Sequence, residues 1–175
     1  MRHPDTSIHR HIFLEPGELH VADRPSVIET ILGSCIAVTM HSSRLRHGAI
    51  CHCQLPDGSS HGPGDLVVEA IPRLLHALLA RGATRDELVV KLFGGSTVLN
   101  STAHQRELRI SLGDQNVNRA LHLLHELQLP LAARDTGGDT GRKLYFYTDS
   151  GEVYIRRQRS SPAKRNAARQ FCRKT

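Results

Sequence analysis

The clearest candidate for nucleophilic chemistry in this chain is the thiol of Cys35. The apolar runs 26–32 and 36–40 are rich in β-branched residues and too short for typical helices, so they predict strands. Gly33 and Ser34 between them predict a tight turn, which would leave the thiol exposed on one side and supported on the other. Backbone N–H groups around such a turn can converge on a developing oxyanion.

The imidazole of His52 is the best partner for this thiol. It lies on a third apolar segment, 49–55, and the polar stretch 42–48 before it ends in Gly, which is typical of a hairpin loop. A hairpin that returns at this point would bring His52 beside Cys35. A base within hydrogen-bond reach can take the proton of a cysteine, which leaves a thiolate–imidazolium pair. We therefore expect a catalytic pair of Cys35 and His52.

Both residues also have other interpretations. Free cysteine is often a small buried hydrophobe, and Cys35 could be one. The run Cys51-His52-Cys53 looks like a cluster of zinc ligands. Alternation along a strand opposes this, because it puts Cys51 and Cys53 on one face and His52 on the other. We therefore expect neither a metal site nor a cofactor.

These motifs resemble those of CheD, the family of bacterial chemoreceptor glutamine deamidases. The likeness covers roughly residues 14–157, nearly the whole chain apart from its ends, so it is more specific than any single short pattern. The segments that carry it are Thr30-Ile-Leu-Gly-Ser-Cys35-Ile-Ala-Val, Gly48-Ala-Ile-Cys-His52-Cys-Gln-Leu-Pro56, Ala70-Ile-Pro-Arg-Leu-Leu, Gly82-Ala83-Thr84-Arg85, Lys91-Leu-Phe-Gly-Gly95, Asp135-Thr-Gly-Gly138 and Gly141-Arg142-Lys143.

The resemblance implies an activity and roles for particular residues. The activity is hydrolysis of selected glutamine side-chain amides on chemoreceptors. The resemblance makes Cys35 the nucleophile, His52 the general base and Thr30 the residue that orients the histidine. Substrate-binding residues are expected at four positions, which are Gly33, Ser34, Gly94 and Gly95.

The Gly94-Gly95 pair follows a predicted strand, 87–93, and lets the backbone approach another chain closely. A simple turn is the alternative from spacing alone, and the resemblance favours a wall of the substrate cleft. The sequence departs from the family pattern here, since Gly-Gly-Ser-Thr-Val replaces Gly-Gly-Ala followed by a Met-containing segment.

Partners also follow from the resemblance. The substrates would be the cytoplasmic helices of methyl-accepting chemotaxis receptors, and CheC, a phosphatase of the chemotaxis response regulator, would dock on the deamidase. We expect a monomer with no nucleic-acid partner and no membrane insertion. Two other functions stay open. One is a non-catalytic adaptor that binds receptors or CheC, and the other is methyl-ester hydrolysis at the same receptor positions through the same thioester chemistry.

Composition predicts a cytoplasmic protein. The 175 residues contain no apolar run long enough to span a bilayer, and the N-terminus lacks the apolar stretch of a signal peptide. The four cysteines do not suggest a disulfide scaffold in a chain of this length. The net charge of +6 is concentrated in residues 156–175, which contain no Asp or Glu. The rest of the chain is therefore close to neutral, and we expect the basic tail to be solvated.

The order of predicted elements indicates one mixed α/β domain. One helix is expected to start at Asp65, bend at Pro72 and end at Gly82, and a second is expected at 115–127 with Asp114 as its cap. The predicted strands are 19–22, 26–32, 36–40, 49–55, 87–93, 108–112 and 131–134, with a closing hairpin of 144–148 and 152–156.

The resemblance implies how these elements pack. It predicts a three-layer sandwich of stacked β-sheets with the two long helices on one side. Residues 12–157 would form the single deamidase domain, with a flexible N-terminus at 1–11 and a flexible basic tail at 158–175.

Overall fold

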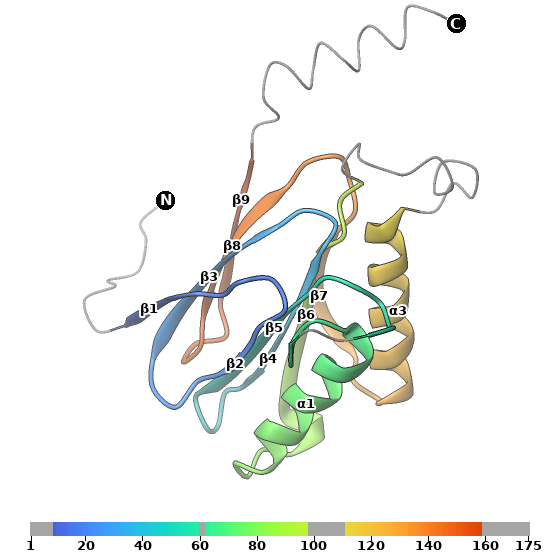
Figure 1. The fold of residues 1–175 in the computed structure, drawn as a ribbon. Coiled ribbons are helices and arrows are strands. Elements are labelled where there is room, and N and C mark those ends of the chain that lie inside the picture. The colour runs from blue at the N-terminus through green and yellow to red at the C-terminus, as the bar shows by residue number, and fades with distance from the viewer. Residues whose placement is uncertain (1–8, 60–61, 98–110, 159–175) are drawn as a thin grey trace, which may run out of the picture.

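The computed structural model describes residues 9–59, 62–97 and 111–158, which form three layers (Figure 1). One layer, the outer sheet, has the strand order β1-β3-β8-β9. The middle layer, the central sheet, has the order β2-β5-β4-β6-β7. The helices α1 (Val67–Leu79) and α3 (Leu112–Glu126) cover the other face of the central sheet. The predicted α/β sandwich with both long helices on one side is therefore confirmed.

The strands are longer or shorter than predicted by one or two residues at most ends. The outer sheet consists of β1 (Arg10–Phe13), β3 (Ser26–Leu32), β8 (Arg142–Tyr147) and β9 (Val153–Arg157). The central sheet consists of β2 (Leu19–Val21), β5 (His47–Cys53), β4 (Ile36–Ser42), β6 (Leu88–Gly94) and β7 (Leu131–Thr136), with the short 3-10 helix η2 (Arg85–Glu87) before β6. The pairs β1–β3 and β6–β7 are parallel, and the others are antiparallel.

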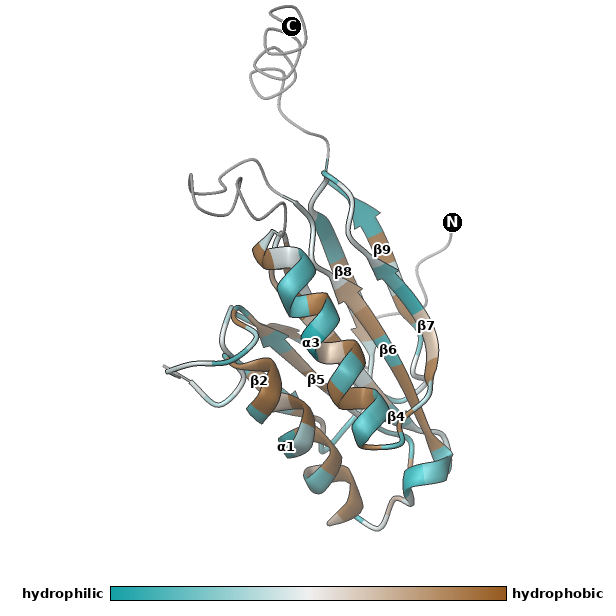
Figure 2. Ribbon diagram, turned by 90° about the vertical axis from the view of Figure 1, so that its right-hand side faces the viewer, coloured by the Kyte–Doolittle hydropathy of each residue, from teal (hydrophilic) through white to brown (hydrophobic). Residues whose placement is uncertain are grey.

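Two hydrophobic cores separate the three layers. The core between the helices and the central sheet contains Cys51, Cys53 and Leu74. The core between the two sheets contains Ala37 and Ile50. Alternation along β5 therefore sends its two cysteines toward the helices and Ile50 and His52 toward the outer sheet, as predicted for the cysteines and the histidine. Figure 2 shows hydrophobic segments running through β4 and β6 and along α1, while hydrophobic and hydrophilic residues alternate on α3.

Both helices are capped differently from the prediction. The N-cap of α1 is Leu66 and not Asp65, because the Asp65 carboxylate is buried and accepts a hydrogen bond of 3.0 Å from the side chain of Gln54. The N-cap of α3 is Ser111. Asp114 instead takes the third helical position of a capping box, where its carboxylate accepts the Ser111 backbone N–H.

Some of the other predictions can be compared with the structure, and some lie outside the described residues. Pro72 lies inside α1, and Gly82 takes a φ of +90° just beyond its last turn, as expected for a helix end. The predicted strand 108–112 lies mostly outside the described residues, and its last residue, Leu112, begins α3. The predicted flexible basic tail also lies outside the described residues, apart from its first residue, Gln158. No helix in the part of the chain that the structure describes is long and apolar enough to cross a membrane.

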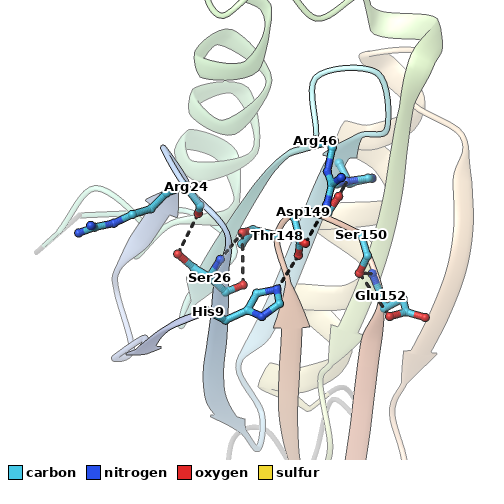
Figure 3. A network of polar contacts seen from close by, with 9 residues as sticks. His9, Arg24, Ser26, Arg46, Thr148, Asp149, Ser150 and Glu152 are labelled. Carbon is cyan, nitrogen blue, oxygen red and sulfur yellow. Dashed lines mark hydrogen bonds and ion pairs between the residues drawn. The ribbon is translucent and has the colours of Figure 1, made fainter. Parts of the chain in front are cut away.

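The expectation of a flexible chain through residue 11 is wrong for its last part. The strand β1 begins at Arg10, where it pairs with β3. His9 lies 3.0 Å from a carboxylate oxygen of Asp149, and Arg46 lies 3.2 Å from the other (Figure 3). The polar composition of this segment gives no sign of these partners, since they come from distant parts of the chain. This network lies where β3 begins, away from the turn that follows β3.

Candidate active site

Cys35 lies on a connection between the two sheets. The strand β3 ends at Leu32 in the outer sheet and β4 begins at Ile36 in the central sheet, so residues 33–35 cross from one sheet to the other. The predicted short connection is present, but the strands on either side of it do not pair with each other. Because β4 lies between β5 and β6, the half-buried thiol has a strand on each side.

The ladder between β4 and β5 puts Cys35 and His52 on the same face. Ala37 pairs with His52, and Cys35 comes two residues before Ala37, so the three side chains point the same way. Diagonal neighbours of this kind are about 7–8 Å apart at their Cα atoms, within reach of an imidazole. Cys35 packs against the core between the sheets, which also contains Ala37. The hairpin predicted to bring the base back to the thiol is therefore present.

A hydrogen bond between the sheets holds the imidazole. Thr30 is buried in β3, and its Oγ1 lies 2.8 Å from Nδ1 of His52 and 2.8 Å from the carbonyl oxygen of Leu14. Because a carbonyl only accepts, the hydroxyl donates its proton to Leu14 and accepts the Nδ1–H of His52. Thr30 therefore makes the predicted contact with the histidine and fixes the neutral ring with its proton on Nδ1.

The second ring nitrogen of His52 is buried. The residue is 1% exposed, and its Nε2 has no hydrogen-bond partner among the residues described. With the proton on Nδ1, Nε2 carries the basic lone pair. A buried polar atom without a partner is costly for folding, and this one is available to accept a proton. The site thus holds an unoccupied base in the same layer as the Cys35 thiol.

Burial favours the neutral form of both groups. It lowers the pKa of His52 to about 4, against smaller opposing effects from the Leu14 carbonyl and Glu18. Burial also raises the pKa of the Cys35 thiol, which its own backbone N–H partly offsets and Asp65 reinforces. The thiolate–imidazolium pair expected from sequence is therefore not the form that these environments favour. At neutral pH they favour a neutral thiol beside a neutral imidazole.

The Gly94-Gly95 pair packs against the backbone of the Cys35 turn. Both glycines are buried, and Gly94 has a φ of +104°. A β-carbon on Gly94 would lie 2.2 Å from the Cys35 carbonyl oxygen, so only glycine fits there. The N–H of Gly95 donates to that carbonyl at 2.8 Å, and the N–H of Ser96 donates to the Gly33 carbonyl at 2.7 Å. The close backbone approach is therefore made within the chain, and substrate contact by the glycines stays a prediction.

A residue that the sequence analysis missed joins the turn to β5. Asn116 on α3 is 0% exposed, and its Nδ2 donates to the carbonyls of Ser34 at 3.1 Å and Gln54 at 2.9 Å. Its spacing from Ala120 and Leu123 puts an amide on the apolar face of a helix, and this signal could have revealed it.

Arg142 is a second residue whose role was not predicted. Its segment, Gly141-Arg142-Lys143, is one of those that carry the family resemblance. Its side chain is 0% exposed, although Arg is almost never fully buried unless it is paired. Nη1 lies 2.7 Å from a carboxylate oxygen of Asp135 and 3.3 Å from the Gly94 carbonyl, and Nη2 donates to the Gly137 carbonyl. Arg142 thereby ties the ends of β6 and β7 together beside the turn.

The two other cysteines near the site lie on the far side of the central sheet. The Sγ atoms of Cys51 and Cys53 are 3.5 Å apart in the core under the helices. The hydrogen bond with Cys51, together with burial, raises the pKa of Cys53. Among the described residues, no group of three or more His, Cys, Asp or Glu side chains could hold a metal ion.

Fold and site together point to a class of protein: an α/β sandwich with a candidate cysteine–histidine hydrolase site where the chain passes between its sheets. Comparison with known proteins identifies the family within this class. A family model described as CheD chemotactic sensory transduction matches residues 54–157. The chain belongs to the CheD family. The match begins after Cys35 and His52, so the argument for these two residues rests on the geometry above.

Relatives named as CheD proteins extend the match over most of the chain. The "Probable chemoreceptor glutamine deamidase CheD 2" of Geobacter sulfurreducens is 45% identical over 156 residues, which is 89% of this chain and 93% of the relative. The "Probable chemoreceptor glutamine deamidase CheD" of Maridesulfovibrio salexigens is 36% identical, over 85% of this chain and 92% of the relative. That of Pseudomonas syringae pv. syringae is 35% identical, over 89% of each chain.

Proposed function

We propose that this protein is a chemoreceptor glutamine deamidase, which hydrolyses glutamine side-chain amides of receptors to glutamate and ammonia. The observation that carries the proposal is the unprotonated Nε2 of His52, which has no hydrogen-bond partner among the described residues and lies on the same strand face as Cys35. An adaptor that only binds receptors has no use for a buried base. The names of the relatives, each a probable chemoreceptor glutamine deamidase, support the choice of substrate.

The first half-reaction forms a thioester on Cys35. The sulfur attacks the side-chain carbonyl carbon of glutamine, the thiol proton moves to Nε2 of His52, and the carbonyl π electrons move to oxygen. Backbone N–H groups of Ser34 and Cys35 stabilise this oxyanion. The C–N bond then breaks, and the proton on Nε2 goes to the leaving nitrogen, which departs as ammonia. Because both groups start neutral, proton transfer accompanies the attack.

The second half-reaction hydrolyses the thioester. Water attacks the acyl carbon as it gives a proton to Nε2 of His52, the C–S bond breaks, and the proton returns to sulfur. The receptor side chain leaves as glutamate. His52 becomes cationic in both halves, and its Nδ1–H keeps its hydrogen bond to Thr30 throughout. A hydroxyl is a neutral acceptor, so it stabilises the imidazolium less than the aspartate of a serine-protease triad does.

Location and partners follow from this activity. The receptor glutamines are on cytoplasmic helices, so we place the enzyme in the cytoplasm, where it acts as a monomer. Docking of the CheC phosphatase belongs to the same proposal and rests on the family resemblance.

Deamidation in vitro tests the proposal. The purified protein is incubated with cytoplasmic fragments of chemoreceptors from its own organism, and peptide masses are measured. We expect a gain of about one dalton at each converted glutamine, with release of ammonia. An adaptor would capture the fragments without changing their mass, and a methylesterase would release methanol from methylated fragments and leave glutamine intact. No conversion of any receptor of that organism would contradict the proposal.

A further inference from the structure

We propose that Asn116 is a positioning residue that aims the backbone N–H of Cys35 at the oxyanion. The inference rests on the proposed function only in taking Cys35 as the nucleophile. Asn116 is fully buried on α3, and both protons of its amide nitrogen are used, one on the Ser34 carbonyl and one on the Gln54 carbonyl. These two carbonyls belong to the nucleophile turn and to the end of the His52 strand.

The hydrogen bond to Ser34 determines where the N–H of Cys35 points. The Ser34 carbonyl and the Cys35 N–H are parts of one peptide group, and the described residues contain no cis peptide bond. In a trans peptide the two groups point in opposite directions. Since Asn116 holds the carbonyl toward α3, the N–H of Cys35 points away from α3. The raised pKa of the Cys35 thiol, which comes mainly from burial, is partly offset by its own backbone N–H, in agreement with an N–H on the side of the sulfur.

Among the described residues, Asn116 is the single side chain that donates a hydrogen bond to a carbonyl of the turn. The carbonyls of Gly33 and Cys35 accept from the backbone N–H groups of Ser96 and Gly95, at 2.7 Å and 2.8 Å. Among the described residues, no carbonyl accepts the N–H groups of Ser34 or Cys35. The orientation of the Cys35 N–H therefore depends on a side chain, which a substitution can remove.

The second hydrogen bond anchors the amide of Asn116 to the segment that follows the His52 strand. Ile36 pairs with Cys53, so Gln54 lies opposite Cys35 when the ladder is continued by one residue. By bridging Ser34 and Gln54, the amide of Asn116 links both strands just beyond their last pair. Its own Oδ1 is buried without a partner among the described residues, which destabilises the fold.

Two reagents separate oxyanion stabilisation from thiol reactivity. Acylation by p-nitrophenyl acetate forms a tetrahedral oxyanion when the thiol attacks the ester, and p-nitrophenolate leaves. Alkylation by iodoacetamide displaces iodide directly and forms no oxyanion. Neither reagent needs the receptor. Cys51 and Cys53 are 0% exposed, and a Cys172→Ser background removes the cysteine that lies outside the described residues.

Asn116→Leu is the main test variant, because leucine has a similar size without donors or charge. We expect acylation of Cys35 to slow by about 100-fold, while alkylation changes by less than about threefold. Asn118→Leu, on an exposed position of the same helix, is the matched control and should change neither rate. An equal fall in both rates, or no fall in either, would overturn the proposal.

Two further measurements keep the test decisive. If thermal melting shows that Asn116→Leu is unfolded, Asn116→Ser is used with the same criteria. In the unsubstituted protein, a small aldehyde forms a hemithioacetal on Cys35, and we expect the Cys35 amide proton to shift downfield in its NMR spectrum. An unmoved amide signal would overturn the proposal. If the wild type fails to deamidate receptors but these results hold, the substrate is wrong and the role of Asn116 stands.

Discussion

The hydroxyl of Thr30 lies 2.8 Å from Nδ1 of His52, and the two residues come from different sheets. The base is thus oriented across the space between the sheets and not by its own strand. The same hydroxyl donates to the Leu14 carbonyl, so a third segment takes part. Correct packing of the outer sheet on the central sheet is therefore a condition for a usable His52.

Thr30→Val should weaken catalysis more than substrate binding. It keeps the shape of the side chain but leaves Nδ1 of His52 without its acceptor, so the ring is less well aligned. We expect kcat for receptor deamidation to fall by about 10-fold to 100-fold with little change in KM. Thr30→Ser, which keeps the hydroxyl, should retain most of the activity. A Thr30→Val enzyme as fast as wild type would contradict this role.

Gly94→Ala should displace the nucleophile turn. The new β-carbon would lie 2.2 Å from the Cys35 carbonyl oxygen, at a φ of +104°. Gly58→Ala is a matched control, because Gly58 has a φ of +114° but nothing within 4 Å of the added carbon. We expect Gly94→Ala to reduce deamidation at least about 100-fold and Gly58→Ala to leave it within about twofold. Similar rates for the two variants would refute the supporting role of Gly94.

The pH dependence of activity distinguishes a neutral pair from an ion pair. Nε2 of His52 can accept the thiol proton only when the ring is neutral, and burial lowers its pKa to about 4. The rate constant kcat/KM should therefore stay level from about pH 8 down to about pH 5 and fall below that with an apparent pKa of about 4. A preformed ion pair would instead lose activity when a cationic His52 loses its proton as pH rises. A decline that starts near pH 6.5 as the pH falls would contradict the lowered pKa of His52, and a loss of activity as the pH rises through the neutral range would contradict the neutral pair.

Stability should also depend on His52 in acid. Its pKa is lowered from 6.5 to about 4 on folding, so between these values the unfolded chain binds the extra proton. Stability from the neutral ring is complete above about pH 6.5 and is lost as pH falls to about 4, by up to about 3 kcal/mol. Denaturant unfolding of wild type and His52→Gln should show this as a steeper acid loss in wild type. Burial also lowers the pKa values of His20 and His41, but their effects are common to both proteins. Equal pH slopes would refute the prediction.

Local patterns predicted much of the site. Alternation in Cys51-His52-Cys53 separates the cysteines from the histidine, and the polar loop before this strand indicates a hairpin to β4. The pairing of strands was harder to predict from the sequence. The runs 26–32 and 36–40 look like neighbours, yet they belong to different sheets. Their apolar character is compatible with either arrangement, because hydrogen-bond partners far along the chain decide which sheet a strand joins.

Burial was the other property that the sequence did not reveal. The side chains of Asn116 and Arg142 are fully buried and hold the turn and the glycine pair through hydrogen bonds to backbone carbonyls. Polar residues such as these usually lie at the surface, so their residue types alone did not indicate burial. Burial also separates the pKa values of Cys35 and His52 in the directions that favour neutral forms. A motif shows which groups are present, and the enclosing structure determines how they are protonated.

The most direct test of the account is the deamidation rate of Cys35→Ala on a receptor fragment that the wild type converts. The account predicts that the variant still binds the fragment and melts like wild type, but that glutamine conversion falls by at least about 1,000-fold, because the thioester can no longer form. Conversion by Cys35→Ala within about tenfold of the wild-type rate would contradict the central claim that this thiol is the nucleophile.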